Sequence, residues 1–434
     1  MDRMISFPYT WAPSLSVPES NLIGVFGPPA GGEPMSEADV LGDALARPIG
    51  APPLAEILRG GKRVLIVSDD HHRPTPVRRI IPPVLEEIRK AGIGRDGVEF
   101  IVALGTHRPM TEHELRNKLG DGIVDGYRVS NHDWTDAKGL AYCGNVPPGI
   151  EVWVNRRVRE FDVVLGLGSI MPIDVCGFTG GGKIMIPGLC GEKTNSDMHW
   201  VRTEIAADLV VGRRENPIRA AIDSAALAGG LTAVFNVVLD SDCRIRHAVF
   251  GHPVEAHRAG ARLSLAAHSA GIPEPADIVI ASSFPFDIEF WQANKALGHA
   301  SLAVRDGGTI ILVSPCSEGL SSTHEKDILG IGYRPSAGIR ELVAAGRLKH
   351  LVVAVHMIQV AQATFDRGVR CILVTPGISP EKLRAANLDT APDPAAALEA
   401  AFRRHGPKSQ VAVLERASET LFLPAGELTK LMET

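Results

Sequence analysis

The chain contains few aromatic residues, few cysteines and no long apolar segment. Its six cysteines are scattered over 434 residues with no C-x-x-C pair, which favours reduced thiols in a cytoplasm over a disulfide framework. No apolar stretch is long enough to cross a bilayer, and residues 1–20 show no basic start followed by an apolar run. We therefore expect a cytoplasmic protein with neither a membrane span nor a signal peptide.

Neither sign of charge is in large excess. The 45 basic and 50 acidic side chains give a net charge of −5, and the two signs are mixed along the chain. A general nucleic-acid binder or a membrane-surface binder would carry a marked positive charge. The composition therefore predicts that neither nucleic acids nor membranes are partners.

The chain does contain a regular alternation of short Val- and Ile-rich runs with longer helical patterns. Strands are predicted at residues 63–68, 98–104, 162–167, 233–239, 277–282, 309–313, 351–355, 371–375 and 410–414. Helices are predicted at residues 76–91, 217–228, 254–270, 291–305, 337–345, 357–367, 380–386 and 394–404. The continuously apolar strands and their alternation with helices indicate an α/β fold with parallel sheets covered on both faces.

The length suggests more than one domain, and the segment Gly271-Ile272-Pro273-Glu274-Pro275 interrupts a long helical pattern. We therefore predict two α/β domains with mostly parallel sheets and an active-site cleft between them. The N-terminal domain, residues 1–272, is expected to bind a cofactor, and residues 273–405 form the C-terminal domain. The last strand and helix, within residues 406–434, are predicted to return to the N-terminal domain.

A glycine-rich loop that ends in a lysine is the most informative segment. The pattern G-x-x-x-x-G-K-[ST] fits from Gly177 to Lys183 and then fails, because Ile184 stands where a P-loop needs a hydroxyl for magnesium. Glycines still allow backbone N–H groups to approach a phosphate. A nucleotide-binding protein is one interpretation, but the missing hydroxyl favours another use of Lys183 beside a nucleotide.

Polar residues follow four of the predicted strands, at the sheet edge where open α/β proteins bind ligands. In chain order they are Asp70, His72, Arg73 and Thr75, then His107, then the glycine loop, then Trp291, Gln292 and Lys295. Each has an ordinary explanation, since Thr75 can cap a helix, His107 can be a loop histidine and Lys295 can lie on a surface helix. The shared theme favours function, because Arg and Lys bind carboxylates or phosphates and His transfers protons near neutral pH.

A histidine follows the glycine loop, sixteen residues beyond Lys183, at His199. Imidazole is a good donor for nickel, copper or zinc. No Cys/His cluster of the zinc type surrounds this residue in the sequence. The spacing alone therefore does not assign a metal, and a structural histidine stays open.

Taken together, these motifs resemble those of the nickel-dependent lactate racemases and their 2-hydroxyacid racemase/epimerase relatives. The resemblance runs over most of the chain. The motifs that carry it are Asp70-x-x-Arg73-Pro74, Gly105-Thr106-His107-Arg108, Gly177 to Lys183 with Pro187-Gly188, His199, and Gln292-x-x-Lys295. Each motif is weak alone, but the combination is specific.

The resemblance implies a nickel-pincer nucleotide, a pyridinium-3,5-bisthiocarboxylic acid mononucleotide that carries Ni(II). Lys183 would form the covalent thioamide link to this cofactor, and His199 would complete the coordination of the nickel. The cofactor-binding loop would comprise Thr179, Gly180, Gly181 and Gly182 beside Lys183. Cofactor-maturation enzymes are then expected partners.

The resemblance also implies a reaction, the reversible transfer of a hydride from C2 of a 2-hydroxy acid to the cofactor. Arg73 and Lys295 would hold the substrate carboxylate, with Gln292 assisting. His107 would be the general base, and the predicted catalytic set also includes Asp70 and His72.

One departure from the family pattern concerns the second base. The racemases place a second histidine ten residues before the lysine, where this chain has Ile173. An isoleucine transfers no proton, which leaves His72, Asp174, a water or the substrate itself as alternatives. His72 stands where the family usually has threonine, and Trp291 stands where lactate-specific members commonly have tyrosine.

These changes predict a racemase or epimerase of a 2-hydroxy acid other than lactate. A non-catalytic carrier of nickel or of its cofactor is an alternative, as is a nucleotide-binding protein that uses the near-P-loop. The sequence leaves the substrate and any homo-oligomeric state open.

Overall fold

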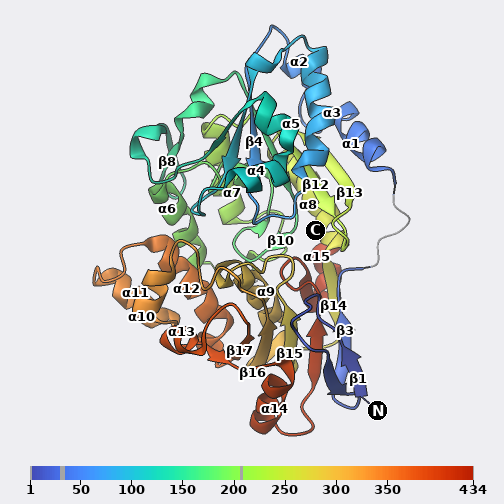
Figure 1. Ribbon diagram of the computed structural model, residues 1–434, viewed down its shortest axis with the longest axis vertical. Helices are drawn as coiled ribbons and strands as arrows, with labels where there is room; N and C mark the ends of the chain where they lie inside the picture. Colours follow the sequence, from blue (N-terminus) through green and yellow to red (C-terminus); the bar gives the residue numbers. More distant parts are fainter. Residues whose placement is uncertain (1, 30–34, 206–208, 434) are drawn as a thin grey trace. The chain divides into compact units, whose positions relative to one another are not determined.

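The computed structural model describes residues 2–29, 35–205 and 209–433. Contacts divide the chain into two compact units. The unit Ala30–Ala267 is called the N-terminal unit below, and the unit formed by Met1–Pro29 with His268–Thr434 is called the C-terminal unit. Figure 1 shows the chain in both units, coloured along the sequence.

The N-terminal unit is built on a six-stranded sheet with the order β13-β12-β9-β4-β5-β6. Its strands are β4 (Val64–Asp69), β5 (Val98–Ala103), β6 (Arg128–Asn131), β9 (Val163–Ser169), β12 (Ala233–Leu239) and β13 (Ile245–Gly251). All neighbours are parallel except β12 and β13. Every residue of β9 and of β12 is buried, as expected for central strands covered on both faces.

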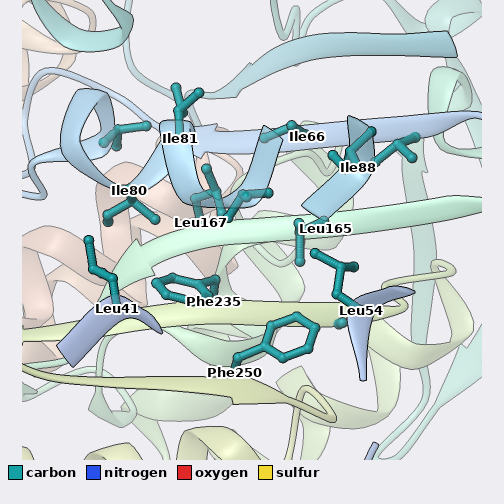
Figure 2. Close-up of a cluster of buried hydrophobic side chains, with 14 of the residues drawn as sticks. Leu41, Leu54, Ile66, Ile80, Ile81, Ile88, Leu165, Leu167, Phe235 and Phe250 are labelled. Atoms are coloured by element: carbon teal, nitrogen blue, oxygen red, sulfur yellow. The ribbon is translucent and has the colours of Figure 1, made fainter. Parts of the chain in front are cut away.

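One face of this sheet packs on α1 (Glu37–Ala46) and α3 (Val77–Lys90) through a continuous apolar core, part of which Figure 2 shows. Ile80 of α3 and Leu165 and Phe235 of the sheet are fully buried there. Burying one such side chain stabilises a fold by about 1.5–3 kcal/mol. The other face packs on α8 (Glu255–Ala267) and the short 3₁₀ helix η4 (Gly181–Ile184), which α7 (Pro217–Ala228) covers. This packing fixes the glycine loop against the sheet.

The C-terminal unit contains a second six-stranded sheet, which is parallel throughout, with the order β18-β17-β16-β15-β19-β3. Its strands are β3 (Leu22–Phe26), β15 (Ala276–Ser282), β16 (Val304–Val313), β17 (Arg370–Val374), β18 (Asp389–Thr390) and β19 (Val411–Leu414). The longer helices of this unit are α9 (Phe290–Ala303), α12 (Leu351–Ala363) and α14 (Pro394–His405).

The structure corrects the predicted domain bounds at both ends. β19, from the tail of residues 406–434, lies between β15 and β3, so the predicted return of this tail to the N-terminal domain is wrong. β3 belongs to the same sheet, so residues 1–29 do not belong to the N-terminal domain either. Both segments belong to the C-terminal unit because β19 pairs with β15 and β3 pairs with β19, which extends the apolar sheet formed by β15 to β18.

One predicted strand is also wrong. Residues 351–355 begin α12, which continues to Ala363, and nearly all of this helix is buried. A short run of apolar residues does not distinguish a buried strand from a buried helix, because neither shows an alternating pattern.

The remaining α-helices and strands include strand pairs that form two-stranded sheets of their own. They are β1 (Asp2–Ile5), β2 (Leu15–Pro18), α2 (Leu54–Ile57), α4 (Glu112–Leu119), α5 (Asp121–Gly126), β7 (Leu140–Val146), β8 (Ile150–Asn155), β10 (Pro172–Ile173), β11 (Gly177–Phe178), α6 (Glu192–Thr203), β14 (Ser269–Ile272), α10 (Glu325–Ile331), α11 (Ser336–Ala344), α13 (Pro380–Ala385), β20 (Leu421–Pro424) and α15 (Ala425–Glu433). Among the described residues, no helix combines the length and the apolar character that a bilayer crossing requires.

Candidate active site

Two of the predicted polar clusters meet at the carboxyl ends of adjacent parallel strands. β4 and β5 pair in register from Val64 with Val98 to Asp69 with Ala103. The segment that contains Asp70 follows β4 directly, and the segment that contains His107 follows β5. The sheet therefore brings together the residues that the sequence placed at two separate strand ends.

A single carboxylate joins these two segments. Oδ2 of Asp70 lies 2.9 Å from Nδ1 of His72 and 2.5 Å from Nδ1 of His107. Burial raises the pKa of the Asp70 carboxyl, but the charges and hydrogen bonds of His107 and His72 outweigh burial and hold the pKa well below its usual range. An ionised carboxylate only accepts hydrogen bonds, so both imidazoles carry their hydrogen on Nδ1. The Nε2 atom of His107 is then the nitrogen that can accept a proton.

The same three side chains are also a set that can ligate a metal, because their donor atoms lie within 4.8 Å of one another. The two hydrogen bonds from imidazole to carboxylate account for this close grouping without an ion. The Asp70 side chain is 3% exposed and that of His107 is 15% exposed. An ionised, buried carboxylate that orients a partly exposed imidazole is suited to proton transfer.

Neighbouring groups hold this segment in place. Lys118 of α4 donates to the carbonyl of Arg73 at 2.9 Å and lies 2.8 Å from Oδ1 of Asp69. The hydroxyl of Thr75 donates to the Asp69 carboxylate and lies 2.8 Å from the Ser169 hydroxyl rather than capping α3, which begins without a side-chain cap. The alternative role of Thr75 as a helix cap is therefore wrong, and the residue ties the segment to the sheet.

The glycines of the loop meet protein atoms rather than open space. A Cβ atom on Gly180 would lie 2.7 Å from Ile170, one on Gly181 would lie 2.7 Å from His257, and one on Gly182 would lie 2.9 Å from Ala226. Gly181 has a φ of +58°, and its N–H donates to Asn236 at 2.8 Å. These glycines are required for close packing of η4, a role that the P-loop pattern did not predict.

Thr179 also has an internal role. Its hydroxyl donates to the carbonyl of Ser169 at 2.8 Å and accepts from the N–H of Met171 at 3.0 Å. Ile184, where a P-loop carries its metal-binding hydroxyl, is buried. The loop is thus arranged for packing, which weakens the interpretation as a nucleotide-hydrolysing site.

A buried arginine that the sequence did not single out holds the loop backbone. Arg219 of α7 is 2% exposed and donates to the carbonyls of Phe178 and Gly180. Its guanidinium also contacts the Cys176 thiol at 3.4 Å and lies 3.6 Å from the Asp223 carboxylate. No pattern in the sequence indicated this role, because an arginine in a helical pattern is ordinarily exposed.

Lys183, at the end of the loop, has its amine in a desolvated and positively charged environment. Burial lowers the pKa of this amine, and the charges of Arg219 and Arg73 lower it further against the opposing effects of Cys176 and Asp174. An amine that loses its proton easily is a nucleophile. The influence of Arg73 also shows that the first polar cluster and the loop belong to one electrostatic environment.

His199 lies on α6, a helix that the sequence did not predict because its apolar residues show no helical period. Nδ1 of His199 donates to the carbonyl of Asn195 at 2.8 Å. Burial and the charge of Lys183 lower the pKa of His199 to about 4. The imidazole is therefore neutral at neutral pH, and its Nε2 lone pair is the one available to a metal.

The fourth predicted cluster lies in the C-terminal unit, on the first turns of α9. The Lys295 amine donates to Oε1 of Gln292 and lies 4.8 Å from the ring centre of Phe286. Gln292 is buried and Lys295 is half-buried. These two side chains therefore contact each other within this unit, and their role beside Arg73 stays a prediction.

An aromatic group that the sequence did not predict surrounds Trp291 on the same helix. The Trp291 ring stacks on the His356 ring with their centres 4.1 Å apart. The centre of the His324 ring lies 4.9 Å from the centre of the Trp291 ring. His356 in turn shares a hydrogen bond of 2.8 Å with the hydroxyl of Tyr333. Burial lowers the pKa of His356 to about 3, so this imidazole is neutral. These residues are far apart in sequence, and only the fold assembles them.

Comparison with known families decides the relationship. A lactate racemase N-terminal domain model matches residues 11–208, and a lactate racemase C-terminal domain model matches residues 272–418. Lactate racemase of Thermoanaerobacterium thermosaccharolyticum is 31% identical over 315 residues, which cover 70% of this chain and 72% of the relative. The chain belongs to the lactate racemase family. Lactate racemase of Lactiplantibacillus plantarum, another relative, is 28% identical over 385 residues, or 88% of this chain and 89% of the relative.

Solved structures agree with this family assignment. The lactate racemase apoprotein of T. thermosaccharolyticum superposes with a TM-score of 0.85 at 26% identity and covers 97% of this chain and 100% of that chain. A protein from Thermotoga maritima, with a TM-score of 0.74 at 22% identity over 91% and 99% of the two chains, shares the fold. The α/β class with two domains and mostly parallel sheets is confirmed, and membership of this family makes the protein an isomerase of the racemase type.

Within the lactate racemase family, this member has an apolar side chain where a second base was expected. Ile173 is 3% exposed and pairs with Gly177 between β10 and β11. The neighbouring Asp174 is buried, and its charge acts on Lys183. The side chain of His72 is 0% exposed. Neither replacement candidate is therefore open to solvent as His107 is.

A substitution tests the packing role of the glycine loop in this family member. Gly181→Ala places a methyl group against His257 and imposes a left-handed φ on alanine, which we expect to lower the free energy of unfolding by about 2–4 kcal/mol. Gly42→Ala is the matched control, since a Cβ at Gly42 in α1 meets nothing within 4 Å and should be neutral or stabilising. Urea titration of both variants measures the difference, and equal midpoints would contradict the packing argument.

Proposed function

We propose that this protein is a nickel-pincer-nucleotide-dependent racemase or epimerase of a 2-hydroxy acid other than lactate. The observation that carries the proposal is that Lys183 and His199 share a desolvated environment, in which burial lowers the pKa of both groups and the charge of Lys183 lowers the pKa of His199 further. The family resemblance of both residues supports the same roles. Reduced cysteines, all six of which are free, fit the cytoplasmic location that we also propose.

The side chains fit the proposed cofactor. An amine that is easily deprotonated suits a covalent thioamide link at Lys183, and a neutral imidazole whose Nδ1 is bound to a carbonyl suits nickel at Nε2 of His199. When bound, a nickel-pincer nucleotide supplies an acceptor that can take a hydride and give it back. The protein then has to bind the substrate, orient it and move one proton.

The residues of the N-terminal unit supply these functions. His107 takes the proton of the substrate hydroxyl at Nε2, because Asp70 holds the hydrogen of the ring on Nδ1. Arg73, with its charge beside Lys183, binds the substrate carboxylate. We propose that Lys295 and Gln292 of the C-terminal unit assist in that binding, as the family resemblance implies.

Two features support a substrate other than lactate. Ile173 removes the second histidine of the family pattern, and Trp291 replaces a residue that is commonly tyrosine in lactate-specific members. The rings of His324 and His356 pack against the Trp291 ring and restrict its movement. Trp291 lies one helical turn from Lys295, so we propose that its ring forms a rigid wall of the substrate pocket. A wall of this kind selects the substituent on C2 by size and shape.

The test is to produce the protein together with cofactor-maturation enzymes and to measure three quantities. Intact mass reports the adduct, metal analysis reports nickel, and chiral chromatography reports turnover of a panel of 2-hydroxy acids. Adduct and nickel with turnover of a hydroxy acid other than lactate support the proposal. Turnover of lactate alone would contradict the substrate assignment.

An isotope experiment tests the reaction type. With a substrate deuterated at C2, we expect the product enantiomer or epimer to keep its deuterium, because a hydride that leaves C2 returns to it without exchange with water. Mass spectrometry of the product formed in ordinary water measures how much deuterium is retained. The control is the unlabelled substrate in D₂O, whose product should take up no deuterium at C2. Loss of the label at the rate of turnover would indicate removal of C2 hydrogen as a proton and would refute hydride transfer.

One observation favours a second candidate function. Because Ile173 is apolar and buried, the protein lacks the second histidine and could bind the cofactor as a non-catalytic nickel or cofactor carrier. Full loading with nickel and adduct, without turnover of any hydroxy acid in the panel, would support this alternative.

A further inference from the structure

One oxygen of the Asp70 carboxylate serves two imidazoles. Oδ2 accepts from Nδ1 of His72 and from Nδ1 of His107, and the two rings lie 4.2 Å apart. The other oxygen, Oδ1, accepts the backbone N–H of His72 at 3.2 Å. Each imidazole that donates to this carboxylate stabilises the negative charge of the carboxylate. The carboxylate then stabilises the protonated form of the other imidazole less.

The two imidazoles differ in exposure. The His72 side chain is 0% exposed, whereas that of His107 is 15% exposed. The His72 ring also lies between two neighbouring rings that are tilted against it, with the ring centre of His71 at 4.1 Å and that of His107 at 4.2 Å. His107 is therefore the imidazole placed to meet a substrate, and His72 is placed to act on Asp70.

Building on the function proposed above, we propose that His72 is a positioning residue. By donating to the same oxygen of Asp70, it keeps His107 less basic than His107 would be as the only imidazole bound to that carboxylate. A base has to give up its proton after each turnover, and an imidazole bound to an undivided carboxylate would hold that proton more tightly. In this role His72 touches neither the substrate nor the cofactor. It is therefore not a replacement for the base missing at Ile173.

Other charged groups surround this cluster, and of these His71 lies directly against the His72 ring. These groups are Asp69, His71, Arg73, Arg108, Glu114 and Lys118. Asp69 lies 2.8 Å from Lys118, and Glu114 pairs with Arg108 at 2.7 Å. Because these pairs stay in place when His72 is changed, a change in the titration of His107 reports on the shared carboxylate.

Two substitutions separate hydrogen bonding from packing. His72→Phe keeps a planar ring but removes the donor, whereas His72→Asn keeps an N–H donor near the position of Nδ1. In apoprotein labelled with ¹⁵N-histidine, we expect the titration midpoint of the His107 imidazole to rise by about one pH unit in His72→Phe. The midpoint should stay near that of the unsubstituted protein in His72→Asn. The His107→Gln variant identifies the His107 signal.

Loaded enzyme gives a second reading. His107 acts as a base only when its imidazole is neutral, so a higher midpoint moves the acid limb of the pH profile of kcat/KM to higher pH. We expect His72→Phe to shift that limb in the same direction as the titration in apoprotein, and His72→Asn to leave it in place.

The control and the contrary outcomes are specific. His71→Phe changes a ring that contacts His72 without a hydrogen bond to Asp70, and it should leave the His107 midpoint unchanged. His72→Leu replaces His72→Phe should the latter not fold. An unchanged or lowered midpoint in the folded donor-free variant, or an equal shift in His72→Asn, would overturn the proposal. Because apoprotein carries no cofactor, this result is independent of whether the nickel-dependent function holds.

Discussion

Replacing Lys183 by arginine is expected to abolish the covalent adduct and with it all detectable racemisation. Lys183 is half-buried, and desolvation together with the charges of Arg219 and Arg73 opposes protonation of its amine, which makes the amine a nucleophile. An arginine keeps a positive charge and a similar length, but its guanidinium is always protonated and forms no thioamide. Intact mass spectrometry of protein produced with the maturation enzymes should show the unmodified chain alone.

A second lysine provides the matched control for this experiment. Lys193 lies ten residues later in the first turn of α6, with its side chain 61% exposed and its amine paired with Asp197 at 2.6 Å. Lys193→Arg should therefore keep the adduct mass, the nickel content and the activity. An adduct of full mass on Lys183→Arg protein would show that the attachment point lies elsewhere, and the proposed function would lose its main support.

His107→Gln is expected to lower kcat by about 10²–10⁴-fold, the usual contribution of a general base. Glutamine fills a similar space and can still donate to Asp70, but it does not take up a proton at neutral pH. Adduct mass and nickel content should not change, because His107 holds neither in the proposed site. Initial rates of racemisation on the best substrate of the panel measure the effect.

The control for this substitution is another histidine of the same region. His113 lies on the exposed surface of α4 and interacts with Asn117 at 3.0 Å. His113→Gln should retain the rate of the unsubstituted protein. A His107→Gln enzyme that keeps a rate near that of the parent would remove His107 from the role of base and would direct attention to Asp174 or to a water.

The sheets of both units could largely be predicted from sequence, because their central strands are continuously apolar. The predicted strand at residues 233–239 coincides with β12, and the predicted helix at residues 217–228 coincides with α7. The edge elements could not be predicted in the same way. β3 is half-buried and short, so its place in the second sheet depends on pairing with β19 rather than on any local pattern.

The candidate site shows the same division. Asp70 and His107 were predictable because each follows an apolar strand, and adjacent strands bring them together. The role of Arg219 and the group of rings around Trp291 were not predictable, because a buried arginine and contacts between rings that are distant in the sequence leave no local pattern. The glycines of the loop were recognised as special, but the reason is the closeness of His257 and Ala226, which come from other helices.

The position of β3 has a practical consequence for dissecting the protein. The chain begins in the C-terminal unit, leaves it after Pro29 and re-enters it at His268, so the N-terminal unit is an insertion between two parts of one sheet. A C-terminal fragment that begins after residue 272 would lack β3 and would expose the edge of β19. The unpaired backbone groups of that edge would promote self-association. A soluble C-terminal fragment should instead join residues 1–29 to residues 268–434 through a short linker, and the excised insertion should begin after Pro29.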